Sequence, residues 1–242
     1  MSRTIGFSTG ALAQGDFRRG LAMSDRQGLD AVELSALRDA ELRPLLAALD
    51  SLDVTGYHYV SFHAPSRFTT VTETDLVQQL RTLLPCRWPI IVHPDTITDF
   101  RLWEGFGEWL CIENMDKRKP IGRTVEELEQ IFKRLPDASF CFDIGHARQV
   151  DPTMSQAAFL LRAYGHRLKQ LHVSEVNSRS KHEPLNYTAV TAFRKVAHLV
   201  PPAVPLILET PITAERMQAQ AALARETFAN STHPVFQKLA VG

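Results

Sequence analysis

The stretch SFCFDIGHARQ, residues 139–149, joins a short apolar segment to two polar residues. Its first residues are small or apolar, which is typical of a strand that is buried on both faces. The apolar segment ends in Asp143, and His146 follows three residues later. Because a buried carboxylate is costly unless another group pairs with it, either these two side chains pair with each other or they share an ion.

Similar apolar segments recur along the chain, and segments with helical spacing separate them. The eight segments are TIGFS, DAVELS, YHYVSFH, PIIVHP, WLCIEN, SFCFDI, LKQLHVS and PLILET. One helical segment, residues 122–135, carries a capping box of Thr124 and Glu127, and Thr72 is the expected cap of another. Eight strands that alternate with helices predict a single parallel (β/α)8 TIM barrel over residues 1–242. The rival, a doubly wound open sheet, usually needs a glycine-rich first turn, and STGALAQG lacks the GxGxxG spacing.

The composition balances 27 basic residues against 27 acidic residues, so the formal net charge is zero. A duplex-binding protein usually has a basic excess, so the balance favours a small-molecule substrate over nucleic acid. No apolar run approaches about 18 residues, and the N-terminal segment lacks the apolar core of a signal peptide. Cys86, Cys111 and Cys141 are isolated, and we expect them to be reduced and buried. These features predict a cytoplasmic protein without a membrane span.

Polar residues gather at the carboxyl ends of the predicted strands, where barrel enzymes have their active sites. Five of the nine histidines fall there. A single histidine at a strand end is usually structural, but carboxylates that converge in a buried site repel one another, and a divalent cation removes that cost. Imidazole and carboxylate ligands together favour zinc, manganese or iron. The residues at the strand ends and in the loops that follow are Glu33, His63, His93, Glu113, Asp143, His146, His172, Glu175, His182 and Glu209.

With these residues, the chain resembles the xylose isomerase-like TIM-barrel superfamily, which includes sugar isomerases and epimerases and the AP endonuclease family 2 (endonuclease IV). The fragments that carry the resemblance, in strand order, are FHAP, VHPD, IEN, FDIGHA, LHVSE and LET. In the epimerase branch one metal ion, often manganese, has four ligands, and the matching positions are Glu113, Asp143, His172 and Glu209. The resemblance makes Glu113 and Glu209 the catalytic residues, which would move a proton beside a metal-polarised carbonyl through an enediolate.

The endonuclease IV branch holds three zinc ions, and the resemblance implies additional ligands. The matching positions for these ligands are His63, His93, His146 and His182. Glu113 would bridge two of the ions. The chain departs from the pattern at the third ion, because the family's Asp-x-His reads SKH here and Ser180 stands where a carboxylate is expected. Glu175 or Glu183 would have to replace that carboxylate.

The primary hypothesis is a divalent-metal-dependent isomerase or epimerase of a sugar or sugar-like small molecule. The alternative is an endonuclease IV-like zinc phosphodiesterase that acts on abasic DNA or another phosphoester. The third hypothesis is a metal-binding barrel that has no catalytic activity and acts with a partner. Arg148, Arg179 and Lys181 follow the sixth and seventh strands and, with Glu175, are either substrate-binding residues or solvated loop residues. The number of bound ions separates the first two hypotheses, since the isomerase needs one ion and the phosphodiesterase two or three.

Overall fold

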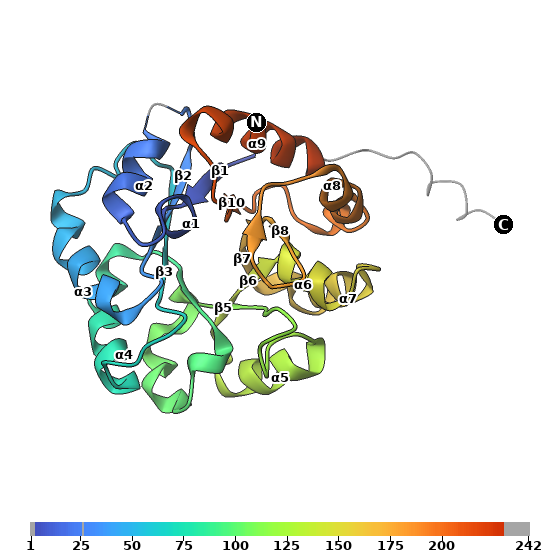
Figure 1. The fold of residues 1–242 in the computed structure, drawn as a ribbon. Helices are drawn as coiled ribbons and strands as arrows, with labels where there is room; N and C mark the ends of the chain where they lie inside the picture. The colour runs from blue at the N-terminus through green and yellow to red at the C-terminus, as the bar shows by residue number, and fades with distance from the viewer. Residues whose placement is uncertain (1–2, 26, 230–242) are drawn as a thin grey trace.

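The computed structural model describes residues 3–25 and 27–229, and within them eight parallel strands close into a barrel (Figure 1). In chain order they are β1 (Ile5–Ser8), β2 (Ala31–Ser35), β3 (Tyr59–His63), β4 (Ile90–Val92), β5 (Leu110–Glu113), β6 (Ser139–Asp143), β7 (Leu168–Val173) and β10 (Leu206–Leu208). β1 pairs with both β2 and β10, which closes the sheet. The structure confirms the predicted parallel (β/α)8 TIM barrel.

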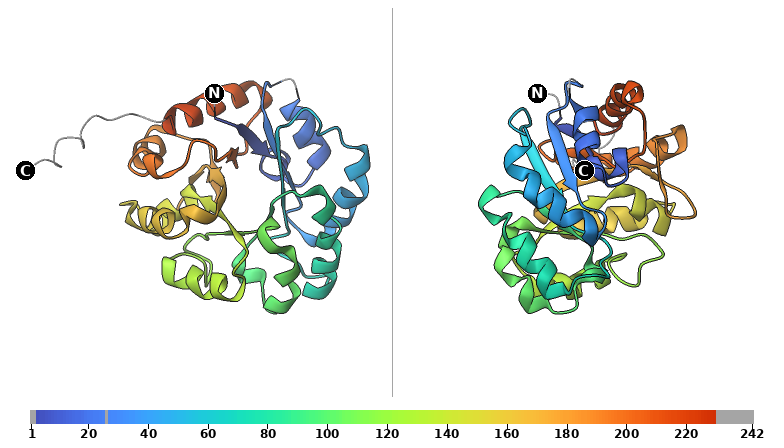
Figure 2. Two further views of the ribbon diagram at one scale, coloured as in Figure 1. Left: turned by 180° about the vertical axis from the view of Figure 1, so that it is seen from behind. Right: turned by 60° about the vertical axis from the view of Figure 1, so that its left-hand side comes forward.

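Helices cover the outside of the barrel, as two further views also show (Figure 2). They are α1 (Thr9–Ala13), α2 (Phe17–Ser24), α3 (Asp39–Ala48), α4 (Glu73–Arg81), α5 (Val125–Arg134), α6 (Ile144–Val150), α7 (Ser155–Tyr164), α8 (Tyr187–Arg194) and α9 (Ala214–Thr227). The connection from β4 to β5 contains only short 3-10 turns. Among the described helices, none is both long enough and apolar enough to cross a membrane.

The predicted helix caps explain where two of these helices begin. Thr72 Oγ1 accepts a hydrogen bond from Asp75 N (3.1 Å) at the start of α4. Thr124 Oγ1 accepts one from Glu127 N (3.3 Å) at the start of α5, and the Glu127 carboxylate accepts from Arg123 N (2.7 Å). Each cap satisfies an amide at a helix end that has no partner within the helix.

The two faces of the strands carry different apolar cores, because successive strand side chains point to opposite faces. On the outer face Phe140 packs against Phe132 of α5, with ring centroids 6.2 Å apart. On the inner face Cys111 and Cys141 pack with Ile91 in a separate small cluster. Both cysteines are free and buried, as expected, but Cys86 is exposed because it ends a surface 3-10 turn.

The loop after β7 carries secondary structure of its own at the carboxyl ends of the strands. It contains an antiparallel hairpin of β8 (Glu175–Val176) and β9 (His182–Glu183). The hairpin holds the ring of His182 against that of His146, with centroids 5.2 Å apart. His182 lies well beyond the end of β7 in the sequence, and the hairpin brings it back to the rim where the strands end.

Candidate metal centre

Four buried side chains from neighbouring strands lie at the middle of this rim. Glu113 ends β5, Asp143 ends β6, His172 lies in β7 and Glu209 directly follows β10. Each offers a ligand atom, and these atoms lie within 4.8 Å of one another. The parallel register explains the convergence, since Asp143 pairs with His172 across β6 and β7. We refer to these four residues as the central group.

Two further groups of possible ligands flank the central group and share one residue each with it. The first comes from the ends of β3, β4 and β5, and the second from β6, α6 and the hairpin. They are the lateral group, His63, His93 and Glu113, and the loop group, Asp143, His146 and His182. The structure thus brings all eight metal ligands expected from the sequence to one rim.

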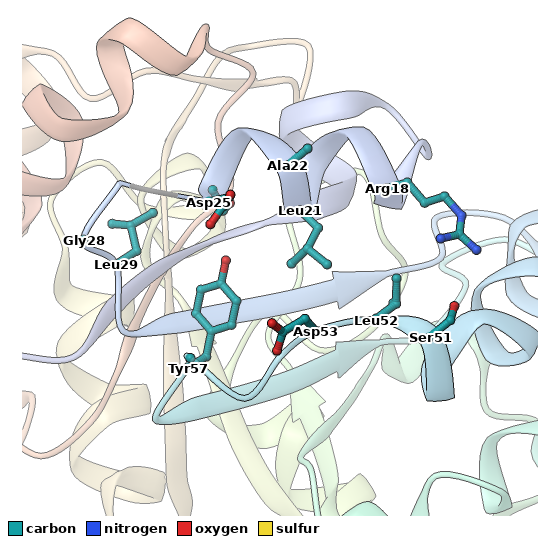
Figure 3. Close-up of a pocket in the computed structure, with 12 residues that line it drawn as sticks. Arg18, Leu21, Ala22, Asp25, Gly28, Leu29, Ser51, Leu52, Asp53 and Tyr57 are labelled. Carbon is teal, nitrogen blue, oxygen red and sulfur yellow. The ribbon is translucent and has the colours of Figure 1, made fainter.

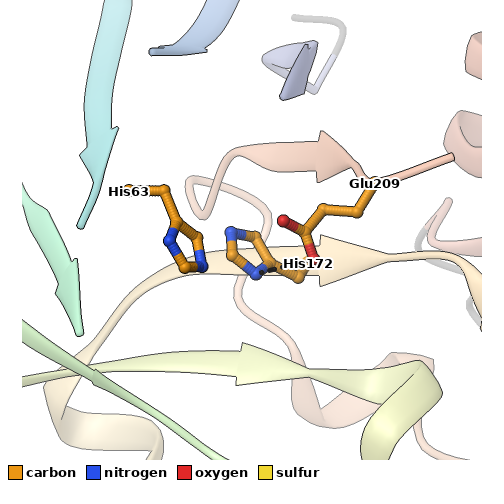
Figure 4. A group of neighbouring side chains, drawn as sticks. All are labelled: His63, His172 and Glu209. Carbon is orange, nitrogen blue, oxygen red and sulfur yellow. Dashed lines mark ion pairs between the residues drawn. The ribbon is translucent and has the colours of Figure 1, made fainter. Parts of the chain in front are cut away.

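Stacked imidazole rings join the lateral group to the central group (Figure 4). The rings of His63 and His172 lie 14° from parallel, with centroids 5.8 Å apart. Glu209 Oε2 lies 3.3 Å from His172 Nδ1. These three residues also offer ligand atoms within 4.8 Å of one another. The possible ion ligands therefore form one continuous centre.

The two carboxylate oxygens of Glu113 face different groups. Oε2 lies 3.2 Å from His63 Nε2 and 3.2 Å from His93 Nε2. Oε1 lies 3.4 Å from His172 Nδ1 in the central group and 3.3 Å from His146 Nδ1. A carboxylate divided in this way is able to bind one ion through each oxygen, so Glu113 is suited to bridge two ions.

Main-chain carbonyls fix the orientation of two histidine rings. His63 Nδ1 lies 2.8 Å from the Ala64 carbonyl oxygen, and His146 Nδ1 lies 3.0 Å from that of Asn114. Because a carbonyl oxygen only accepts, each ring donates from Nδ1, and in the neutral ring the lone pair is on Nε2. This is the usual arrangement of a histidine that binds a metal ion.

Asn114 ties the ends of β5 and β6 together. Its Nδ2 donates to the Asp143 carbonyl oxygen (2.8 Å), and its Oδ1 accepts from Asp143 N (2.8 Å). Asp143 Oδ1 in turn accepts from His146 N (2.6 Å), which leaves Oδ2 directed at the centre. Asn114 stands within the IEN fragment, but its role depends on a neighbouring strand and was not predicted.

Three ligand atoms of the central group lack the hydrogen bonds that buried polar atoms normally make. Among the residues that the structure describes, Glu113 Oε1, Asp143 Oδ2 and His172 Nδ1 have no hydrogen-bond partner. A divalent cation would bind these lone pairs and offset the repulsion between the carboxylates. The donors therefore fit one zinc or manganese ion in the central group, with His63 and His93 available for a second.

Carboxylates raise the pKa of two histidines at the centre, His63 and His146, although burial opposes the charged form. Burial acts to lower the pKa of His146, but Asp143 and Glu113 outweigh it and raise the pKa to about 10. Burial also opposes protonation of His63, and the Glu113 carboxylate contributes to raising its pKa to about 9. Without an ion, protons on these rings therefore balance the negative charge of the carboxylates.

Ion binding should release protons, and affinity should fall as the pH falls. The pKa values of His63 in the lateral group and His172 in the central group are raised, so both rings are protonated at neutral pH and must lose a proton to bind an ion. We expect calorimetric titration with zinc at pH 7, in buffers of different ionisation enthalpy, to detect release of about one to two protons per chain. Binding without proton release, and with the same affinity at pH 6 and pH 8, would contradict this expectation.

A cavity of 630 Å³ opens above the centre, and five basic side chains line it together with the carboxylates of Glu113, Asp116 and Glu209. The basic residues that line it are Arg38, Arg67, Arg118, Lys119 and Lys181. Asp116 holds the Arg118 guanidinium (Nη2 to Oδ2, 3.1 Å), and Asp95 holds Lys119 Nζ (2.6 Å). All of these basic residues except Lys181 were not predicted from the sequence, because they stand in loops after β2, β3 and β5 and not at strand ends.

The predicted substrate-binding residues lie in different places. Lys181 lines the cavity. Arg148 instead binds the Glu175 carboxylate, and it lines a separate hollow beside Tyr187 of α8. Arg179 is exposed in the turn of the hairpin. Of these four predicted residues, only Lys181 belongs to the lining of the cavity within the part of the chain that the structure describes.

The loop group has no carboxylate of its own besides the Asp143 that it shares with the central group. Ser180 Oγ accepts a hydrogen bond from Gln149 Nε2 (2.6 Å), and its carbonyl oxygen accepts one from Arg118 (3.3 Å). Glu175 binds Arg148, and Glu183 Oε1 accepts from Asn177 (2.7 Å). Neither glutamate replaces the missing carboxylate, so we expect ions in the central and lateral groups only.

Replacing Ser180 by Asp should complete a third ion site. Ser180 lines the cavity and has a left-handed backbone (φ 55°), which aspartate adopts more readily than most residues. We expect zinc content after equilibrium dialysis to rise by about one ion per chain over the wild type, since a carboxylate joins two histidines. The control, Ser178→Asp, adds the same charge to an exposed position of the hairpin. Equal zinc content in the Ser180 variant and the wild type would refute the expectation.

A second hollow, of 460 Å³, lies between α2 and the segment that leads to β3 (Figure 3). Its lining includes Leu29, just before β2, and Tyr57, before β3, so it faces the amino ends of the strands. None of the described ligand groups reaches it. Residues at this end of a TIM barrel usually serve stability, so we assign the hollow no catalytic role.

Comparisons with known proteins support the fold. No family model matches the sequence, and no curated protein sequence matches it. Endonuclease IV from Thermus thermophilus has a similar structure, with a TM-score of 0.58 and 20% identity over 93% of this chain and 98% of that one. The two chains share the TIM-barrel fold. The structure of AsfvAP:AG matches with a TM-score of 0.59 and 13% identity over 94% of this chain and 98% of the other.

An uncharacterized B. cereus protein is a further structural match to this barrel. Its TM-score is 0.50, with 11% identity over 96% of this chain and 65% of that one. At identities this low, the structural matches establish a shared fold but do not establish the reaction. The comparisons therefore confirm the TIM-barrel fold that the resemblance implied, and the reaction has to be argued from the site.

Proposed function

We propose that the protein is a metal-dependent phosphoester hydrolase whose centre binds two divalent ions. The observation that carries the proposal is the divided carboxylate of Glu113, with Oε2 at 3.2 Å from both His63 and His93 and Oε1 toward the central group. A one-ion isomerase uses the central group alone and gives His63 and His93 no ion to bind. Two ions that share a carboxylate are a recurrent arrangement in enzymes that cleave phosphoesters.

The charge of the cavity supports an anionic substrate. Five basic side chains line it, although the net charge of the chain is zero. Arg118 keeps its guanidinium at the cavity through Asp116, and guanidinium groups bind phosphate oxygens in a bidentate manner. Endonuclease IV, whose fold is similar over 93% of this chain, is by its name an enzyme that cuts nucleic acid. For these reasons we rank phosphoester hydrolysis above sugar isomerisation, which the sequence alone favoured.

Each part of the site has a separate task in the proposed reaction. His63, His93 and the central group would hold the ions, which supply Lewis-acid activation of water and neutralise charge on the phosphoryl group. Glu113 fixes the separation between the two ion sites. Arg118 and Lys119 bind the non-reacting phosphate oxygens and orient the phosphorus for in-line attack. The burial of the central group keeps bulk water away from these charges.

Hydrolysis assays on zinc-loaded and manganese-loaded protein test the proposal. The substrates are bis(p-nitrophenyl) phosphate, p-nitrophenyl phosphate and a duplex oligonucleotide with one abasic site. We expect cleavage of at least one of them that disappears on dialysis against a chelator and returns on reloading. No cleavage of any of the three by fully loaded protein would refute the hydrolase.

One observation favours the isomerase as a second candidate. The central group by itself supplies a complete ligand set for one ion, and it includes the two carboxylates, Glu113 and Glu209, that proton transfer needs. Burial raises the pKa of Glu209 to about 7, which suits a group that takes up and returns a proton near neutral pH. Exchange of solvent deuterium into an aldose or ketose, catalysed by the loaded protein, would support this candidate.

A further inference from the structure

Glu33 of β2 is a fully buried carboxylate beneath the metal centre, and neither candidate reaction uses it. Its Oε2 accepts hydrogen bonds from Ser61 Oγ (3.1 Å) and Gln170 Nε2 (2.7 Å). The same oxygen lies 3.0 Å from His172 Nε2. Three neighbours thus converge on one oxygen inside the barrel, and one of them is a ligand of the central group.

The Gln170 amide and the Glu33 carboxylate favour different positions for the ring proton of His172. Gln170 Oε1 accepts from the Tyr59 hydroxyl (2.7 Å), so its amide nitrogen faces Glu33 and donates to it. That nitrogen also lies 2.7 Å from His172 Nε2, but it can donate there only when the ring proton is on Nδ1, the position that faces the ion ligands. A carboxylate only accepts, so a proton on His172 Nε2 completes the contact with Glu33.

The other nitrogen of His172 faces the ion ligands. Nδ1 lies 3.4 Å from Glu113 Oε1 and 3.3 Å from Glu209 Oε2. It has no hydrogen-bond partner among the described residues, although the ring is completely buried. An ion would therefore bind at Nδ1, and this requires that the ring proton stay on Nε2.

We infer that Glu33 is a positioning residue that holds the proton of His172 on Nε2 and so presents Nδ1 to the ion of the central group. A carboxylate behind a metal-binding histidine fixes its tautomer and makes the ligand more basic, and its removal typically costs 10–100-fold in metal affinity. The inference rests on the metal centre of the proposed function but on neither reaction. Its tests therefore measure metal binding and the ring proton, so they stay informative if the hydrolase proposal fails.

The Glu33→Gln variant tests the inference against a structural role. The change keeps the size of the side chain but removes the charge and adds an N–H group that can face His172. We expect the dissociation constant for zinc, from competition with a chromophoric chelator, to rise about 10–100-fold for the ion of the central group. Melting temperatures of the metal-free proteins report separately on stability.

A matched control comes from the same network. Ser61→Ala removes another donor to Glu33 Oε2 and leaves His172 in place. Its zinc affinity should stay within about threefold of the wild type, which is close to the error of such comparisons. Equal zinc affinities in the Glu33 and Ser61 variants would overturn the inference.

Nuclear magnetic resonance of the unmodified protein gives a second test that does not depend on a variant folding. In ¹⁵N-histidine-labelled, zinc-loaded protein, we expect His172 Nε2 to carry a proton and Nδ1 to show the chemical shift of a metal-bound nitrogen. A proton on Nδ1, or zinc bound at Nε2, would overturn the inference.

Discussion

Replacing Glu113 by Gln should abolish hydrolysis and reduce the zinc content of the protein. The amide oxygen is a neutral, weak ligand, and the amide nitrogen cannot bind an ion. The side chain therefore keeps only one ligand atom and is unable to bind an ion in the lateral group and another in the central group at the same time. We expect kcat/KM to fall by at least roughly 1000-fold, which corresponds to about 4 kcal/mol of transition-state stabilisation. Elemental analysis of the same sample should detect the loss of at least one ion.

A matched variant controls for the substitution itself. Glu108→Gln makes the same change just before β5, where the side chain is 61% exposed and pairs with Lys169. It should retain wild-type zinc content and activity. Retention of full activity by the Glu113 variant would mean that Glu113 is not part of the catalytic centre.

Replacing His93 by Asn should separate the two candidate reactions. His93 belongs to the lateral group and not to the central group, and its Nε2 faces Glu113 Oε2. A two-ion hydrolase should lose one ion and roughly 100- to 1000-fold in kcat/KM, because the second ion loses one of its few protein ligands. A one-ion isomerase should keep the ion of the central group and most of its activity.

The control for this variant is His166→Asn, in the 3-10 turn that precedes β7 at the other end of the strand. It should behave as the wild type in zinc content and in hydrolysis. If the His93 variant hydrolyses phosphoesters at the wild-type rate, the lateral group does not take part in the reaction.

The fold and the convergence of the candidate metal ligands were accessible from the sequence because both depend on the strands. Runs such as PIIVHP and SFCFDI combine a buried strand with a polar residue at its carboxyl end. In a parallel barrel all such ends meet at one rim, so the order of the strands alone predicts which side chains converge. Glu113 and Asp143 were found in this way, each from its own strand.

The remaining parts of the site depend on contacts that no local pattern encodes. Arg118 reaches the cavity because Asp116 and the Ser180 carbonyl hold it there. Arg148, with equal charge, binds Glu175 instead. Glu33 was noticed as a strand-end carboxylate, but its contact with His172 crosses the inside of the barrel. Whether such a side chain contacts the site depends on its length and on its partners elsewhere in the barrel, which the local sequence does not specify.

The number of zinc ions that the protein binds at saturation tests the central claim most directly. The claim is that Glu113 joins two ion sites, one in the lateral group and one in the central group. Metal-free protein should be equilibrated with excess zinc, freed of unbound metal by gel filtration and measured by elemental analysis. The account predicts two ions per chain, with one lost in both the Glu113→Gln and His93→Asn variants. A single ion per chain in the saturated wild-type protein would contradict it.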